Sequence, residues 1–571
     1  MNFPIFLKLR EHELKIITVN ELDNVSLLRS NPLKKYRINK NDFSAKSFLA
    51  GESDVIKSLA SVPGVSLYGE GSVMFNLRGG DKGQNAILID DAPVYNPSHL
   101  LGFFSTIAPE AINSMTIYKS NFPISQGGRL SSYVDIRTKD GDMSKLGFGG
   151  IFSPVLCTFT LDGPIKKDKC SFYTTFRKSN INYLFPENNL DILFYDFHFK
   201  INYKPSRKNR FFFAIYRGFD NIQFQNSAIR WRNNTMTFRW NHLFSDKLFS
   251  NTTVYSSLYQ YFFYYSLQDN VFWNSDISNF SIKQDYTYYK NSFHKLYIGF
   301  ETKIHSFNPG NLTLGNYYLH KVYAGNVWSN NVYFGGEYKP SDKISVNYGL
   351  RFTNWNNYGP TKVYSFDSEH RIKDTLNFGT SIFNSYNKFS PRISLHYLIN
   401  STSTISLAYD QNVQFLHYLT NSISPFTTID FWIPANMFIE PQTANQLTLG
   451  FLKKFTEIDF SIELFAKKMN NQVDYANQPN LFLNPFFESQ LRFGKSYSAG
   501  IEVSLQKQKG DFKFTISYAY SRTIRTTPDV NFNNPYSAIW DKPHNLYFNL
   551  SYNFSDRFSI NTSFVYLSGN R

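Results

Sequence analysis

Two arginines, Arg78 and Arg129, stand beside pairs of glycines and are the clearest candidates for specific chemistry in this sequence. Arg78 precedes Gly79-Gly80, and Arg129 follows Gly127-Gly128. A guanidinium is permanently charged and presents a rigid fork of donors that matches a carboxylate, while glycine lets the adjacent backbone turn sharply. The two segments therefore predict fixed cations that need carboxylate partners.

Motifs typical of enzymes are incomplete. Gly494-Lys495-Ser496 ends like a phosphate-binding loop, but Ser489 stands where that loop needs glycine, and Gly69-x-Gly71 lacks a third glycine. No two of the 11 histidines are close enough in sequence for a helical zinc motif. Cys157 and Cys170 flank a predicted turn at unequal distances, which disfavours a disulfide. We expect no enzyme activity, no cofactor and no resident metal.

The two arginines belong to a compact segment, residues 51–141, that predicts a small α+β domain. Glu52 and Asp54 suit the first turn of a helix whose apolar residues continue at helical spacing to Val62, before Pro63-Gly64 ends it. Short apolar runs at 86–89, 115–118 and 133–136 predict strands.

Aromatic residues are distributed very unevenly along the chain. The first 141 residues hold 13 of them and the remaining 430 hold 90, including all seven tryptophans. No run of about 18 apolar residues predicts a transmembrane helix, and mean hydropathy is −0.36. A membrane β-barrel reconciles these facts, because only alternate residues of each strand face lipid.

Alternation after residue 142 supports this interpretation. Phe512, Phe514 and Ile516 alternate with polar residues, as do Ile393, Leu395 and Tyr397 and many other sets. Tight turns such as 555–557 alternate with long connections such as 411–440, which is the layout of outer-membrane barrels. The predicted fold is an all-β, antiparallel transmembrane barrel. About 19 strands are recognisable in residues 142–571.

Several motifs of residues 52–141 resemble the plug domain of TonB-dependent outer-membrane receptors, in particular the subgroup with the sequence YNPSHLxGFFS, here Tyr95 to Ser105. Asp91 stands where the family usually has glycine, and Lys119-Ser120-Asn121 replaces lysine-glycine-glycine. The plug signature carried over by these motifs comprises Pro63, Gly64, Arg78, Gly79, Gly80, Asp90, Pro93, Gly127, Gly128 and Arg129.

The resemblance implies that the small domain is a plug inside the lumen of a barrel of about 22 strands. It further implies active import of a scarce nutrient, such as a siderophore-iron complex, with energy from the partner protein TonB. It also implies that the two plug arginines meet two barrel glutamates. Glu502 matches one of these, whereas Thr448 occupies the position of the other. We therefore predict a plug-barrel lock of Arg78, Arg129 and Glu502; salt bridges within the plug, with Asp90 or Asp135, are the alternative.

Residues 1–50 form an N-terminal segment in which Ile16, Ile17, Thr18 and Val19 resemble a TonB box, the short strand that pairs with TonB. An ordinary first strand, or the end of an upstream domain, is the other interpretation. The formal net charge of +15 comes from dispersed lysines and arginines, which suit anionic lipid head groups and a polar lumen better than nucleic acid. An anionic ligand is compatible with this charge.

Aromatic residues in the long connections suit ligand stacking or simple loop packing. They are Phe415, Tyr418, Phe426, Trp432, Phe486 and Phe487. Besides import, the sequence allows a surface-binding or signalling barrel receptor in the outer membrane, whereas a folded plug argues against a passive porin.

The segment at the N-terminus is too short and too charged for an export signal, and the last strand lacks the aromatic end typical of such barrels. We expect the full-length gene to encode an export signal before Met1 and about three more strands after Arg571. Sequencing the flanking DNA checks this, and stop codons without either feature would contradict it.

Overall fold

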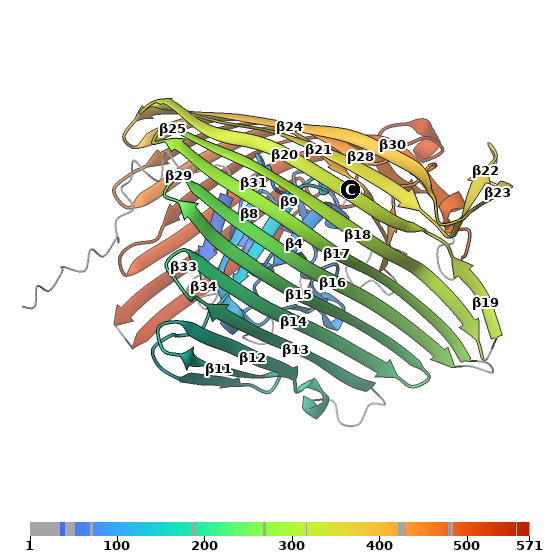
Figure 1. The fold of residues 1–571 in the computed structure, drawn as a ribbon, viewed down its shortest axis with the longest axis horizontal. Coiled ribbons are helices and arrows are strands. Elements are labelled where there is room, and N and C mark those ends of the chain that lie inside the picture. The colour runs from blue at the N-terminus through green and yellow to red at the C-terminus, as the bar shows by residue number, and fades with distance from the viewer. Residues whose placement is uncertain are drawn as a thin grey trace, which may run out of the picture.

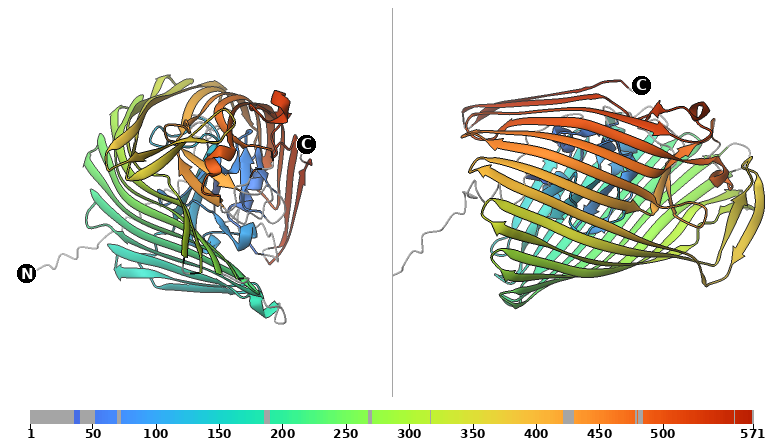
Figure 2. Two further views of the ribbon diagram at one scale, coloured as in Figure 1. Left: turned by 90° about the vertical axis from the view of Figure 1, so that its right-hand side faces the viewer. Right: turned by 90° about the horizontal axis from the view of Figure 1, so that it is seen from above.

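The computed structural model describes residues 35–39, 52–68, 72–184, 190–266, 270–315, 317–420, 430–477, 479, 484–555 and 557–569. A large antiparallel sheet, here called the wall, curls around a smaller N-terminal domain, the plug (Figures 1 and 2). No helix among these residues is long and apolar enough to cross a bilayer.

The wall contains 21 strands among the described residues, and 19 remain when the short β19 and β32 are set aside, in agreement with the prediction. In order of pairing they are β10 (Gly147–Phe152), β11 (Leu156–Lys166), β12 (Cys170–Ser179), β13 (Leu190–Tyr203), β14 (Asn209–Phe224), β15 (Ser227–Ser245), β16 (Leu248–Ser266), β17 (Asn270–Asn291), β18 (His294–Leu314), β19 (Tyr317–Val322), β20 (Asn326–Ser341), β21 (Ile344–Tyr358), β24 (Ile382–Asn400), β25 (Ser403–Gln414), β28 (Gln442–Lys454), β29 (Ile458–Tyr475), β30 (Leu491–Lys507), β31 (Phe512–Thr526), β32 (Tyr536–Ser537), β33 (His544–Ser555) and β34 (Phe558–Leu567).

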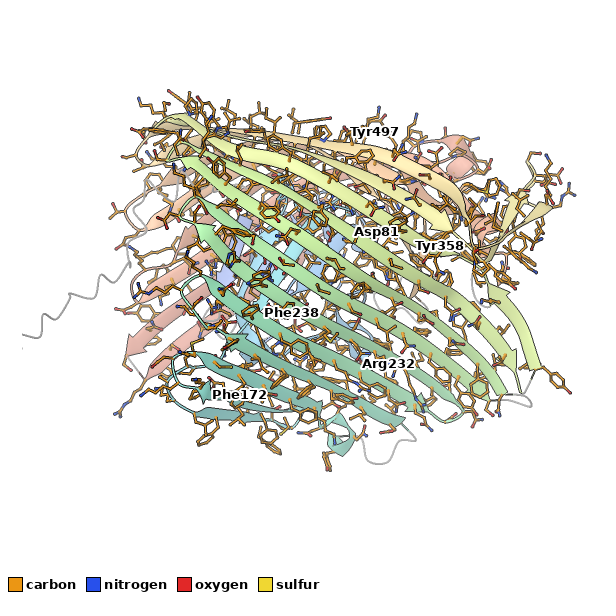
Figure 3. The ribbon with its side chains drawn as sticks, viewed as in Figure 1. Asp81, Phe172, Arg232, Phe238, Tyr358 and Tyr497 are labelled. Carbon is orange, nitrogen blue, oxygen red and sulfur yellow. The ribbon has the colours of Figure 1, made fainter. Side chains whose placement is uncertain are left out.

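Side chains of the wall alternate between its two faces, as predicted. In β25, Ile405 and Leu407 are exposed on the outer face, while Ser406 and Asp410 are buried on the lumen side. Phe238 of β15 and Tyr497 of β30 are further exposed aromatic residues (Figure 3). The outer face therefore suits lipid, and the inner face presents polar groups to the plug.

The connections differ between the two ends of the wall. At one end they span two to five residues, for example 246–247 and 204–208. At the other end most are longer, and two contain hairpins of their own: β22 (Thr361–Phe366) with β23 (Ile372–Phe378), and β26 (Leu416–Thr420) with β27 (Asp430–Pro434). The short 310 helices η6 (Ile181–Leu184), η7 (Phe487–Gln490) and η8 (Asn531–Asn533) also lie at this end.

The plug is built on a five-stranded sheet in the order β1-β8-β9-β4-β5. Its strands are β1 (Lys35–Asn39), β8 (Ile112–Tyr118), β9 (Ser132–Thr138), β4 (Asn85–Ile89) and β5 (Ala92–Pro93). The smaller elements are β2 (Val65–Leu67), β3 (Phe75–Leu77), β6 (Ser98–His99), β7 (Phe104–Ser105) and the 310 helices η2 (Lys57–Ser61), η3 (Lys82–Gln84), η4 (Leu100–Gly102) and η5 (Pro109–Ala111). The three predicted strands correspond to β4, β8 and β9.

Two local expectations need correction. The helix predicted from Glu52 to Val62 is only the 310 turn η2, because the Asp54 carboxylate accepts from Lys57 N at 2.8 Å and from Ser105 N at 2.8 Å, which ties the segment to the neighbouring loop. So short a segment gains little from helical cooperativity. The polar stretch before the plug also contributes β1, which pairs antiparallel with β8. The TonB-box candidate 16–19 lies outside the described residues.

The plug has an apolar core of its own. This cluster includes Val55, Leu59, Ile117 and Val134, all fully buried, and only Tyr173 and Tyr216 join it from the wall among its buried members. Smaller apolar clusters join the plug to the wall at Tyr95, Phe104 and Leu130, and polar groups make further contacts that are described below.

Candidate functional site

Four buried charges join the plug to the wall and are here called the charge cluster: Arg78, Lys119, Glu463 and Glu502. Arg78 Nε donates to Glu502 Oε1 at 2.8 Å, and its Nη2 donates to Glu502 Oε2 at 2.8 Å and also to Glu463. Lys119 Nζ lies 3.0 Å from Glu463 Oε1 and also contacts Glu502. Their side chains are at most 1% exposed, so two cations and two carboxylates balance in a buried environment.

Strand register places the two carboxylates side by side. Glu463 of β29 and Glu502 of β30 are direct partners in the antiparallel ladder, and both point into the lumen. Like charges directly opposite each other destabilise a sheet. The pair is therefore stable only while Arg78 and Lys119 remain in place.

The backbone of the plug is shaped to deliver these cations. Arg78 follows β3 with φ of +47° and Gly79 has φ of +74°, a sharp left-handed turn. Gly64 approaches so closely that a Cβ atom there would lie 2.1 Å from Glu502 Oε1. The neighbouring Pro63 carbonyl accepts from Lys119 Nζ at 3.1 Å. The Pro63-Gly64 and Arg78-Gly79-Gly80 motifs therefore serve one site.

Electrostatics keep both plug cations charged. Burial alone would lower the pKa of Arg78, but Glu502 and Glu463 outweigh it and hold that pKa above its ordinary value. The pKa of Lys119 is raised in the same way, burial being outweighed by Glu463 and Glu502. Both cations therefore remain charged while the cluster is intact.

Arg129 does not belong to this site, which corrects the predicted three-residue lock. Its guanidinium lies 4.7 Å from the ring centre of Trp432, and its Nη1 donates to Gly128 O at 2.9 Å. None of the described carboxylates forms an ion pair with it. The Gly127-Gly128 turn, with φ of +94° at Gly128, directs it to another part of the lumen.

Sequence reasoning missed Lys119 and Glu463. Thr448, where the second glutamate was sought, lies 3.4 Å from Arg78 Nη1 through its hydroxyl, while the second carboxylate comes from the neighbouring strand β29. A signal is present in the sequence, because Ile462 and Leu464 alternate with Ser461 and Glu463, and apolar residues that face lipid place Glu463 in the lumen.

The remaining signature residues have structural positions. A Cβ on Gly80 would lie 1.7 Å from Ser131 Oγ, and one on Gly127 would lie 2.4 Å from Arg351 Nε. Asp90 accepts from Lys200 Nζ of β13 at 3.4 Å. Pro93 lies in the edge strand β5, where a missing N–H is tolerated.

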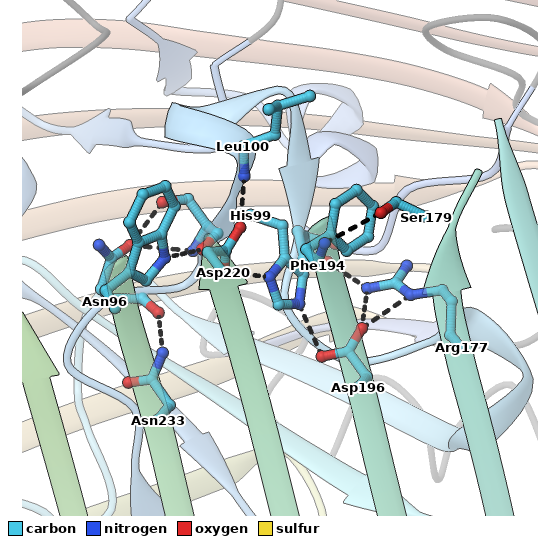
Figure 4. A network of polar contacts seen from close by, with 12 residues as sticks. Asn96, His99, Leu100, Arg177, Ser179, Phe194, Asp196, Asp220 and Asn233 are labelled. Atoms are coloured by element: carbon cyan, nitrogen blue, oxygen red, sulfur yellow. Dashed lines mark hydrogen bonds and ion pairs between the residues drawn. The ribbon is translucent and has the colours of Figure 1, made fainter. Parts of the chain in front are cut away.

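A second polar network surrounds His99 of the YNPSHL motif (Figure 4). His99 Nδ1 lies 2.6 Å from Asp220 Oδ2, and Nε2 lies 2.7 Å from Asp196 Oδ1. Both nitrogens must donate to satisfy these carboxylates, so the ring is an imidazolium. Arg177 Nε and Tyr216 Oη also donate to Asp196, at 2.7 and 2.6 Å. Burial lowers the pKa of His99, but the two carboxylates outweigh it and raise the pKa to about 9.

Two other residues of this motif attach by backbone carbonyls, and Leu100 N donates to Asp220 Oδ1 at 2.8 Å. Trp231 Nε1 donates to Ser98 O at 2.9 Å, and Asn233 Nδ2 donates to Asn96 O at 2.7 Å. Charge and hydrogen bonding therefore fix the motif to β13, β14 and β15.

The aromatic residues proposed for ligand stacking are mostly covered by protein. Phe415, Trp432 and Phe487 are 4, 5 and 2% exposed, which favours the loop-packing interpretation over an open stacking surface. The hairpin β26–β27 folds inward, so that Trp432 packs edge-on against Tyr95 of the plug, with the ring centres 5.7 Å apart. Of the other candidates, Tyr418 contacts Trp432 with ring centres 5.0 Å apart, and Phe486 packs against Tyr364 with ring centres 5.1 Å apart. Phe426 lies outside the described residues.

Glu502→Ala should loosen the plug, because it leaves Arg78 and Lys119 with one carboxylate between them. Breaking a buried pair in this way costs about 3–5 kcal/mol. Hydrogen exchange of β8 and β9 in the folded barrel measures the effect. Glu457→Ala, at an ion pair with Lys507 whose glutamate side chain is 57% exposed, is the matched control and should leave exchange unchanged. Equal protection in both variants would contradict a locking role.

His99 should make plug attachment pH-dependent. Because its pKa is about 9 in the folded protein and about 6.5 when unfolded, its stabilising contribution is complete below about pH 6.5 and is lost as pH rises through about 9. We expect His99→Gln to weaken exchange protection of the plug at pH 6.5 and to have little further effect near pH 10. The His370→Gln variant, at a histidine outside the plug, serves as control. If the exchange protection of the plug differed between wild type and His99→Gln by the same amount at every pH, the charged state of His99 would not stabilise plug attachment.

Comparison with known families agrees with this architecture. Residues 172–571 match the family "TonB dependent receptor-like, beta-barrel", and residues 39–131 match "TonB-dependent Receptor Plug Domain". No curated protein matches the sequence.

Solved structures share the fold at low sequence identity. The copper transporter OprC is 12% identical with a TM-score of 0.71, covering 93% of this chain and 86% of that chain. The unliganded ferric citrate transporter FecA is 12% identical with a TM-score of 0.71, and the match covers 94% of this chain and 84% of that chain. The siderophore receptor PirA from Acinetobacter baumannii is 14% identical with a TM-score of 0.65, and the match covers 94% of this chain and 87% of that chain. With a plug inside an antiparallel wall and a family match over most of its length, the chain belongs to the TonB-dependent receptor family.

Proposed function

We propose that this chain is an outer-membrane active transporter that binds a scarce nutrient at its outer face and imports it with energy supplied through TonB. The observation that carries the proposal is the buried charge cluster. A plug held in the lumen by Arg78 and Lys119 against Glu463 and Glu502 does not permit free diffusion. Passage therefore requires work that separates these charges.

The solved structures with this fold support the ligand class. They include siderophore receptors, a ferric citrate transporter and a copper transporter. We propose a siderophore-iron complex or another scarce, chelated nutrient as the ligand of this chain, and TonB and outer-membrane lipid as its partners.

The geometry offers a route from the N-terminal segment to the charge cluster. Lys35, the first residue of β1, pairs with Tyr118, the last residue of β8, and Lys119 follows directly. Lys119 Nζ also lies 4.9 Å from the ring centre of Tyr36. Tension on residues 1–34 would thus reach the plug sheet beside a cation of the cluster. Because β1 is an edge strand, it can be removed without breaking the rest of the sheet.

The function is tested by growing a deletion strain, complemented with the full-length gene, on single iron or carbon sources, with and without TonB. We expect one source to require both the gene and TonB. Growth that requires the gene and not TonB would overturn active import. Binding of the same nutrient to cells without any uptake would favour a surface-binding or signalling receptor.

A further inference from the structure

A cavity lies between the outer half of the plug and the wall strands β16, β17, β18, β20 and β21, beneath the hairpin β26–β27. It offers about 120 Å³ to the centres of water molecules, enough for roughly ten waters at 10–15 Å³ each. Arg129, Tyr95, Lys303, Trp355, Phe415 and Trp432 are among its lining residues. A compact organic group therefore fits this space.

Positive charge exceeds negative charge on the lining of this cavity. Glu301 is shared by two cations, Arg351 Nη2 at 2.9 Å and Lys303 Nζ at 3.1 Å. The lining carboxylate of Asp91 is likewise shared by Arg137 and Arg239. Arg129 adds a cation for which no carboxylate among the described residues is an ion-pair partner.

Arg129 is held where an anion could reach it. It is 9% exposed, and its Nε is buried without a hydrogen bond. Burial lowers its pKa, although nearby tyrosines oppose this. A buried cation without a counter-ion is energetically costly. An anion in the cavity would remove that cost and would accept a hydrogen bond from the free Nε–H of Arg129.

The rest of the lining is aromatic. Trp432 carries the Arg129 guanidinium on its face and contacts Tyr95, and Phe415 stacks on Trp355 with ring centres 4.8 Å apart. Flat apolar surfaces beside one unpaired guanidinium suit a planar ring that bears a negative group.

We propose that this cavity binds an aromatic carboxylate, with Arg129 as its charged anchor and Trp432, Tyr95 and Phe415 as its apolar walls. The assignment rests on the proposed import function, because it names the chemistry of a group that the imported ligand would carry. It also gives the second glycine-flanked arginine a role distinct from that of Arg78.

The test is calorimetric titration of the purified full-length protein in detergent with benzoate and with benzamide, its neutral isostere. Wild type should bind benzoate and not benzamide. Arg129→Gln should raise the benzoate Kd about tenfold or more, as expected for loss of a charged hydrogen bond. Arg129→Lys should recover part of the affinity, and Arg232→Gln, on the outer side of β15, should leave it unchanged.

Thermal unfolding separates binding from folding. Benzoate should raise the unfolding midpoint of wild type and not that of Arg129→Gln, whose midpoint without ligand should be no lower than that of wild type. Equal benzoate affinity in wild type and Arg129→Gln, equal binding of benzamide, or displacement of benzoate by equimolar chloride would overturn the proposal.

These outcomes are independent of energy coupling. Arg129-dependent binding in a protein that supports no TonB-dependent growth would leave the ligand assignment in place and overturn import. TonB-dependent growth together with benzoate binding that does not depend on Arg129 would leave import in place and overturn the ligand assignment.

Discussion

The structure depends on the neutralisation of two adjacent carboxylates that are buried between plug and wall. Glu463 and Glu502 face each other across neighbouring strands, and the wall contributes no cation to their ion pairs among the described residues. The plug supplies both counter-charges. Wall and plug are thus each incomplete alone at this point, since separating them leaves like charges together on both sides. The Gly64 approach and the left-handed turn at Arg78 are consequences of the same requirement.

The fold was largely predictable because its signal is repeated many times. Because each strand alternates, one misread strand changes the predicted fold little. The tight turn near residues 555–557 and the long connection near residues 411–440 also fall where the sequence indicates. The Arg78–Glu502 contact was also predictable, since each residue stands in a short motif. Glu463 was missed because it stands in no motif, although the alternation of β29 places it in the lumen.

The errors have a common physical cause. Arg129 resembles Arg78 in local sequence, but the direction of its side chain depends on a glycine turn and on what the hairpin β26–β27 brings near it. The helix predicted from Glu52 to Val62 has suitable spacing, but side-chain contacts of Asp54 shorten it to one turn. The aromatic loop residues are covered because a long connection folded inward. Local pattern specifies which groups are available, whereas contacts between distant segments decide their partners.

The plug's apolar core, which takes only two buried side chains from the wall, has a consequence for how this architecture diversifies. Because the plug's own core is nearly self-contained, its interior can change sequence without matching changes in the wall. The residues that must change together are those at the contact: the buried ion pairs, and the small apolar clusters in which Tyr95, Phe104 and Leu130 pack against wall residues. A plug transplanted into another wall would therefore be accepted only where both its charges and these side chains find matching partners.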